Sequence, residues 1–139
     1  MMTKQSFLAS QQDLLLLIAR VLLVILFLVA GVPKLLHFSG TVAYMGSVGA
    51  PLPAIAAAIA VFMEVPAVIA LLVGFWTRPL ALLLAIYTIG SALIGHPFWT
   101  MTGAEQANNA IHFYKNLAIA GGFLALCAAG PGRFSIDRG

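Results

Sequence analysis

The sequence predicts an all-α integral membrane protein, a bundle of four transmembrane helices, from its composition and from four long apolar stretches. Of the 139 residues, 62% are hydrophobic and only 8% are charged, whereas charged residues make up about a quarter of an ordinary soluble domain. The mean hydropathy of +1.04 agrees with this. A soluble domain of this length would need far more polar residues to cover its surface, but lipid accepts an apolar exterior.

The apolar stretches predict membrane-spanning helices at residues 14–36, 54–73, 79–96 and 110–129. Each stretch has close to the roughly 20 residues needed to cross a hydrocarbon core about 30 Å thick. Turn-forming residues separate the stretches, and Gly130-Pro131-Gly132 ends the fourth. Because four spans in so short a chain leave no room for a soluble domain, we expect one transmembrane domain over residues 1–139 and expect any large partner to be a separate chain.

The first connecting segment contains apolar residues at mixed three- and four-residue spacings between Phe38 and Val48. This spacing predicts a short helix that lies in the outer membrane interface. A plain ordered loop is the alternative, because Gly40 and Gly46 disfavour a helix.

The positions of Lys and Arg predict the orientation of the bundle. If the spans alternate, one side receives most of the basic residues of the loops and termini: Lys4, Arg78, Arg133 and Arg138. The loops on the other side, 37–53 and 95–109, contain no Lys or Arg, so the positive-inside rule places both termini in the cytoplasm. These basic residues are scattered singly, and the net charge of +3 therefore gives no support to nucleic-acid binding.

Three charged residues lie inside the predicted spans, where a lone ionised side chain costs on the order of 3 kcal/mol. Glu64 lies about 15 Å deep in the second span, and Arg20 and Lys115 lie about 9 Å deep from opposite faces. In one interpretation, Glu64 pairs with Arg20 or Lys115 and fixes the register of the helices. In the other, Glu64 lines a pocket or a proton path. Pro66 favours the second, because a proline inside a helix removes a backbone hydrogen bond and bends the helix.

The histidines and the cysteine lack the spacing of a metal site. His37, His96 and His112 do not have the i, i+4 spacing of metal ligands on one helix. Cys127 is the single cysteine, which excludes an internal disulfide. We therefore expect that the chain holds no intrinsic metal or haem.

Polar residues of the fourth span complete a predicted cluster within the membrane. His112, Lys115 and Asn116 share one helix face and are expected to project into the bundle. Catalytic residues stay unassigned, because nothing in the sequence resembles a phosphate loop, a dinucleotide fingerprint or a nucleophile elbow. The predicted polar or binding cluster comprises Arg20, Glu64, His112, Lys115 and Asn116.

Several motifs follow one another along nearly the whole chain: Arg20, Gly31-Val32-Pro33-Lys34-Leu35, Gly49-Ala50-Pro51-Leu52-Pro53, residues 64–74 followed by Arg78, His112-Phe113-Tyr114-Lys115-Asn116-Leu117-Ala118, and residues 130–137. Together they resemble the DoxX family, small four-helix proteins of bacterial and archaeal cytoplasmic membranes. The resemblance implies a multi-pass protein of the bacterial cytoplasmic (inner) membrane.

The resemblance also implies a redox association. Some members are described as small subunits of a thiosulfate:quinone oxidoreductase, and others as membrane partners of redox and thiol-stress enzymes. The first functional hypothesis is a membrane subunit or partner of a quinone- or thiol-linked redox complex, with a quinone-sized pocket near Glu64. The alternative is a stand-alone binding or transport protein for a small lipophilic or lipid-like molecule.

The resemblance supplies no catalytic residue, and we expect the chain alone not to be catalytic. Small residues such as Gly121 and Gly122 in the fourth span suggest close helix packing or self-association into a homo-oligomer.

Overall fold

The computed structural model of this chain describes residues 4–138, with side chains from residue 7 onward. Its secondary-structure elements within this part are all helices. Four helical segments are long and apolar enough to cross a membrane: Gln12–Leu36, Pro53–Leu72, Thr77–Thr100 and Gly103–Ala129. The predicted fold class of four membrane-spanning helices is therefore confirmed.

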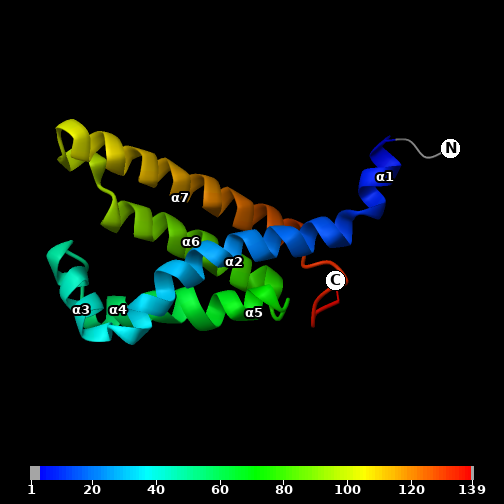
Figure 1. Ribbon diagram of the computed structural model, residues 1–139, viewed down its shortest axis with the longest axis horizontal. Helices are drawn as coiled ribbons and strands as arrows, with labels where there is room; N and C mark the ends of the chain where they lie inside the picture. Colours follow the sequence, from blue (N-terminus) through cyan, green and yellow to red (C-terminus); the bar gives the residue numbers. More distant parts are fainter. Residues whose placement is uncertain (1–3, 139) are drawn as a thin grey trace.

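The helices follow one another in an up-and-down arrangement (Figure 1). A short helix, α1 (Lys4–Ser10), precedes the first span, α2 (Gln12–Leu36), and α3 (Phe38–Ser47) follows it. The second span consists of α4 (Pro53–Phe62), the π-helical turn η1 (Met63–Ala67) and α5 (Val68–Leu72). The third span contains α6 (Thr77–Gly95) and the 3-10 turn η2 (Phe98–Thr100), and α7 (Gly103–Ala129) is the fourth.

The fourth span begins earlier than the sequence predicted. The apolar stretch starts at residue 110, but α7 starts at Gly103 and includes the polar residues Glu105, Gln106, Asn108 and Asn109. Backbone hydrogen bonding continues a helix through polar side chains, because only the part inside the hydrocarbon must be apolar. The apolar run therefore marks a part of this helix and not its whole length.

Residues 38–47 form the helix α3, so the alternative of a plain loop is wrong. The Thr41 hydroxyl lies 3.1 Å from the carbonyl oxygen of Lys34 and 3.2 Å from that of His37. These contacts connect α3 to the last turn of α2. The position of α3 in the membrane interface stays a prediction.

One face of α2 packs into the core of the bundle. The buried positions Arg20, Val24, Phe27 and Gly31 recur at intervals of three and four residues, which is the spacing of one helix face. The Phe27 ring packs edge-on against Phe123 of α7, with 5.5 Å between ring centroids. The opposite face of α2 exposes large apolar side chains along its length, which suits contact with lipid.

The bundle is closed at one end and open at the other. Helices α6 and α7 pack closely against each other, and α6 also contacts η1 and α5. Within the described chain, however, no Cα atom of α4 lies within 8 Å of a Cα atom of α6. Figure 1 shows the two diverging toward the end of the molecule where α3 lies.

The segment after α7 folds back over the closed end. The N–H groups of Ile136 and Asp137 donate hydrogen bonds to the carbonyl oxygens of Val73 and Gly74, at 3.0 and 2.9 Å. The Asp137 carboxylate accepts a hydrogen bond of 2.8 Å from the N–H of Thr77, at the start of α6. The C-terminal segment therefore links α5 to α6.

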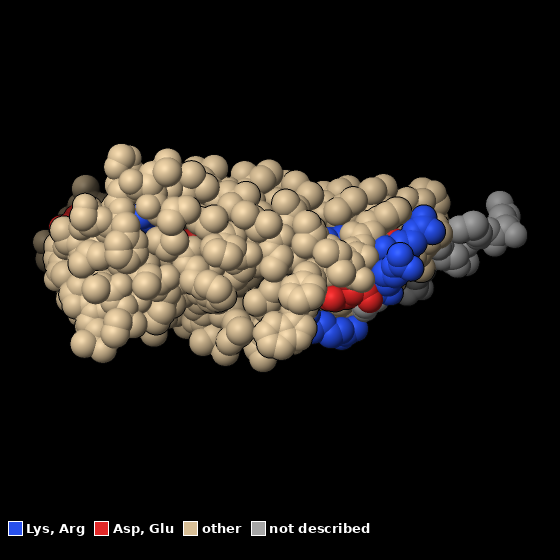
Figure 2. All heavy atoms as spheres, turned by 90° about the horizontal axis from the view of Figure 1, so that it is seen from below, with Lys and Arg blue, Asp and Glu red and all other residues tan. Residues whose placement is uncertain are grey.

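The exposed arginine side chains gather at this same end. On the face that Figure 2 shows, Lys and Arg side chains concentrate near the C-terminus, next to a long belt of uncharged atoms. Arg133 and Asp13 form an exposed ion pair of 3.7 Å there. The positive-inside rule predicts that basic residues collect on one side of the membrane, and this distribution agrees with it.

Candidate functional site

Glu64 lies in η1, a π-helical turn within the second span that also contains Pro66. Proline has no N–H for the helix ladder and crowds the preceding turn, and a local π-helical turn accommodates this inside a membrane helix. The sequence predicted a bend here, and the structure has the π-helical turn. Glu64 is buried within the bundle, only 3% exposed.

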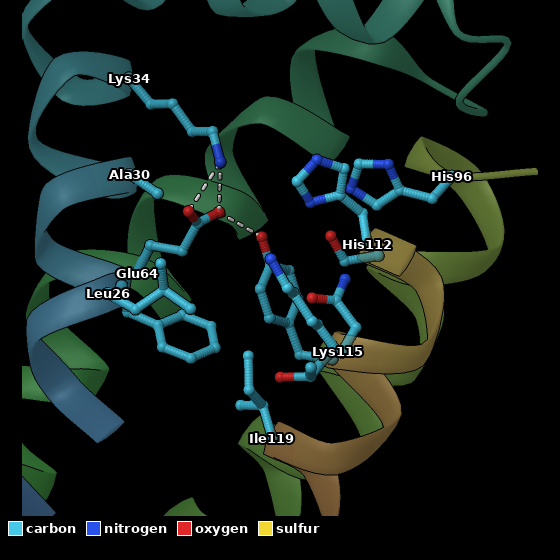
Figure 3. Close-up of a pocket in the computed structure, with 13 residues that line it drawn as sticks. Leu26, Ala30, Lys34, Glu64, His96, His112, Lys115 and Ile119 are labelled. Carbon is cyan, nitrogen blue, oxygen red and sulfur yellow. Dashed lines mark hydrogen bonds and ion pairs between the residues drawn. The ribbon is translucent and has the colours of Figure 1, made fainter. Parts of the chain in front are cut away.

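Two side chains from neighbouring helices bind the Glu64 carboxylate (Figure 3). The Lys34 Nζ, from α2, lies 2.6 Å from Oε1 and 2.9 Å from Oε2. The Tyr87 hydroxyl, from α6, donates a hydrogen bond to Oε2. A buried carboxylate requires such compensation by a cation and by hydrogen-bond donors. Glu64 is therefore buried and pairs with a cation from another helix, which agrees with the first of the two interpretations of the sequence except for the identity of the cation.

Gly31 allows α2 to approach the π-helical turn. A Cβ at Gly31 would lie 2.5 Å from the Glu64 Cβ and 2.7 Å from the Glu64 carbonyl oxygen, and real side chains do not approach so closely. Lys34 follows three residues later, on the same helix face. The close approach at Gly31 therefore brings the Lys34 ammonium within reach of the carboxylate.

The ion pair forms one wall of a cavity of about 330 Å³, within the range of about 300 to 1,000 Å³ that is typical of small-molecule sites. Apolar side chains of α2 and α7 and polar side chains of α6 and α7 form the remaining walls. The lining residues are Leu26, Phe27, Ala30, Lys34, Glu64, Tyr87, Thr88, Ser91, His96, His112, Lys115, Asn116 and Ile119.

Two histidines line the cavity, one directly after α6 and one in the N-terminal half of α7. The rings of His96 and His112 stack with 5.0 Å between their centroids. The His96 Nδ1 lies 2.9 Å from the side-chain oxygen of Asn109, which holds the His96 ring in place. Among the described residues, no three His, Cys, Asp or Glu side chains are placed to hold a metal ion.

The cation that pairs with Glu64 is Lys34, so the prediction of Arg20 or Lys115 is wrong. Lys34 follows Pro33 in the last turn of α2. Its flexible stem reaches the carboxylate, and 31% of the side chain stays exposed. The sequence feature that could have identified Lys34 as the partner is its position three residues after Gly31, on the buried face of α2.

Arg20 does not belong to the cluster. It lies roughly 20 Å from Lys34 along the α2 axis, at the closed end of the bundle. There the buried guanidinium donates hydrogen bonds to the carbonyl oxygens of Leu72 and Phe134. Two of its three side-chain nitrogens thus bind backbone carbonyls of α5 and of the C-terminal segment, while Nε has no hydrogen-bond partner among the described residues.

The other four predicted cluster residues line one cavity: Glu64, His112, Lys115 and Asn116. The Lys115 side chain points from α7 into this cavity (Figure 3). Among the described residues, no carboxylate lies within 4.0 Å of its ammonium. Sequence reasoning did not assign Lys34, Tyr87 and His96 to the site, and the binding role of the cluster stays a prediction.

Comparisons with known proteins agree on a family and a location. The sequence profile of the DoxX family matches residues 15–97. Inner membrane protein YphA of Escherichia coli (strain K12) is 55% identical over 127 residues, which cover 91% of each chain. Inner membrane protein YqjF of the same strain is 38% identical over 130 residues, which cover 91% of this chain and 92% of that protein. No solved structure matches the chain.

Proposed function

Because the chain belongs to the DoxX family and is a small polytopic inner-membrane protein, we propose that it is the membrane subunit of a quinone-linked redox complex and binds the quinone head in the Glu64 cavity. The observation that carries this proposal is the convergence of hydrogen-bond donors on one cavity with apolar walls inside the bundle. Such a combination is typical of sites for small lipophilic molecules.

The cavity offers the groups that a quinone head requires. The quinone ring packs against apolar side chains, and the cavity offers Phe27 and Ile119 for this contact. The carbonyl oxygens of the quinone accept hydrogen bonds. Lys115 and Asn116 present donors on the α7 side of the cavity. An ammonium without an ion-pair partner stabilises the negative charge that a quinone oxygen gains on reduction.

Reduction of a bound quinone requires electrons from outside this chain. Reduction of a quinone to a quinol takes up two electrons and two protons. In the proposed complex both electrons come from a separate redox subunit and both protons come from water, and this chain binds and positions the head. Tyr87 lines the cavity and holds the Glu64 carboxylate in place through its hydrogen bond.

Equilibrium binding of a decyl-substituted para-benzoquinone to the chain in lipid nanodiscs tests the proposal. Glu64→Gln and Tyr87→Phe should each weaken binding by at least about tenfold, because each disrupts the polar wall of the cavity. The matched control is Glu105→Gln, which removes the same charge from an exposed position of α7 outside the cavity. Equal affinities of wild type and both cavity variants would refute the quinone site.

Gentle purification tests the redox complex itself. The proposal predicts that a redox enzyme purifies in stable stoichiometry with the chain and loses quinone reduction in the Glu64→Gln variant. A monodisperse protein that retains a lipophilic molecule and has no enzyme partner would instead indicate the stand-alone binding or transport function.

A further inference from the structure

A second cavity, of about 590 Å³, adjoins the Glu64 cavity at the open end of the bundle. Side chains of α3, α4 and α6 and of the segment between α3 and α4 form its walls, and most of them are apolar. Representative lining residues are Met45, Leu52, Ile55, Ile59 and Ile94. The cavity lies between α4 and α6, whose Cα atoms stay more than 8 Å apart within the described chain.

The two cavities share a boundary. Lys34, Tyr87, Ser91 and His96 line both of them. A molecule in the Glu64 cavity therefore meets the larger apolar cavity on the other side of these four residues. The shared side chains are polar, so an extended molecule that passes between them would have polar side chains at one end and apolar side chains at the other.

We propose that the two cavities form a single site for an amphiphilic quinone, with the head beside Glu64 and the apolar tail between α4 and α6. This inference rests on the proposed function and adds to it the position and the selection of the tail. The first cavity has a polar wall and the second has mostly apolar walls, which matches a molecule with a polar head and one long apolar chain. A head-only quinone would leave the larger cavity without a role.

The membrane limits the free energy that the tail can contribute to binding. Lipid is as apolar as the walls of the cavity, so transfer of a tail from lipid into the cavity gains little hydrophobic free energy. The gain comes from close packing and from holding the tail in line with the bound head. The cavity should therefore discriminate between tails by their shape. A mutant side chain that fills the cavity should weaken quinone binding moderately.

Gly90 provides a variant that fills the second cavity. It lines that cavity but not the Glu64 cavity, and a Cβ at Gly90 meets no atom within 4 Å. Gly90→Leu should therefore fold normally and occupy space meant for the tail. Gly121→Leu is the matched control, because Gly121 lies in the helix α7, a Cβ there also meets no atom within 4 Å, and it lines neither cavity.

Two probes separate the tail from the head: a para-benzoquinone with a decyl chain and the same quinone without it, both titrated into the chain in nanodiscs. The ratio of variant to wild-type affinity is compared for each probe, so that partitioning into lipid cancels. Gly90→Leu should weaken binding of the decyl quinone about tenfold and leave the affinity for the chainless quinone unchanged. Gly121→Leu should change neither affinity.

The outcomes distinguish this inference from the proposed function. If Gly90→Leu leaves decyl-quinone binding unchanged, or weakens both probes equally, the tail does not lie in the second cavity, although the head site stands. In that case a bilayer acyl chain is the better occupant of this cavity. If neither quinone binds the wild-type chain, the proposed function is wrong and the inference falls with it.

Discussion

Lys34 and Glu64 join the first and second spans through an ion pair inside the bundle, with the ammonium 2.6 and 2.9 Å from the two carboxylate oxygens. The two partners differ in exposure: the Glu64 side chain is 4% exposed and that of Lys34 is 31% exposed. The carboxylate therefore depends on the ammonium more than the ammonium depends on it, because only Lys34 can turn toward the membrane surface if the pair is broken.

This pair predicts a non-additive double-mutant cycle. Lys34→Met should lower stability by about 3 kcal/mol, since it leaves a buried carboxylate without a cation. Glu64→Gln should cost less, and the double variant should recover part of the loss. Thermal unfolding in detergent measures all three. Glu64→Gln combined with Lys115→Met serves as the control and should show no recovery, and recovery in that combination would contradict the assignment of Lys34.

The close approach of α2 to the π-helical turn predicts the effect of Gly31→Ala. The new methyl group would lie 2.5 Å from the Glu64 Cβ, so the helices must separate, at a cost of about 1 to 3 kcal/mol. Gly121→Ala is the control, because a Cβ there meets no atom within 4 Å and alanine favours a helix by up to about 1 kcal/mol. Equal melting temperatures for the two variants would argue against the tight contact.

The four spans were predictable because lipid imposes a length and a composition on any helix that crosses it. The start of α7 was not, since the mostly polar stretch 105–109 continues the helix beyond the apolar stretch. Helix α3 was predictable only as one of two alternatives, because apolar spacing and the two glycines argued in opposite directions.

The candidate site was predictable in kind and only partly in its members. A carboxylate at the bilayer midplane requires a partner, which identified Glu64 from its depth alone. The choice among cations depends on which helix faces meet and on how long side chains turn, and neither follows from depth. The position of Arg20 against the carbonyl oxygen of Phe134 requires the C-terminal segment to fold back, a long-range contact that no local pattern indicates.

The hydrogen bonds of Arg20 are predicted to hold the C-terminal segment against the bundle. Arg20→Met removes its charged hydrogen bonds to the carbonyl oxygens of Leu72 and Phe134 and should lower stability by about 3 kcal/mol. It should also accelerate tryptic cleavage after Arg133, because the segment loses a contact to the bundle. Lys115→Met, which removes a membrane cation far from this segment, should leave the cleavage rate at the wild-type value. Unchanged cleavage in Arg20→Met would show that other contacts hold the segment.

Asp137 predicts a pH dependence of stability. Hydrogen bonds from the N–H groups of Thr77 and Trp76 hold the pKa of this carboxyl below its usual range. Its contribution is therefore complete above the unfolded pKa of about 3.9 and is lost as pH falls through the lower folded value. Asp137→Ala should destabilise the protein by about 1 kcal/mol near neutral pH, as expected for a lost helix cap. The difference in melting temperature between wild type and variant should shrink toward zero in acid, and a constant difference would refute the role.

The basic end of the bundle predicts that both termini face the cytoplasm. Arg133 and Arg138 lie in the C-terminal segment, and Arg78 donates hydrogen bonds to the carbonyl oxygens of Cys127 and Ala128, so all three belong to the closed end. Cytoplasmic retention of such an end follows from the positive-inside rule. A green fluorescent protein fused after Arg138 should be fluorescent, and alkaline phosphatase at the same position should be inactive. For comparison, a phosphatase inserted in the loop before Gly103 should be active, and the reverse pattern would place the open end of the bundle, with both cavities, toward the cytoplasm.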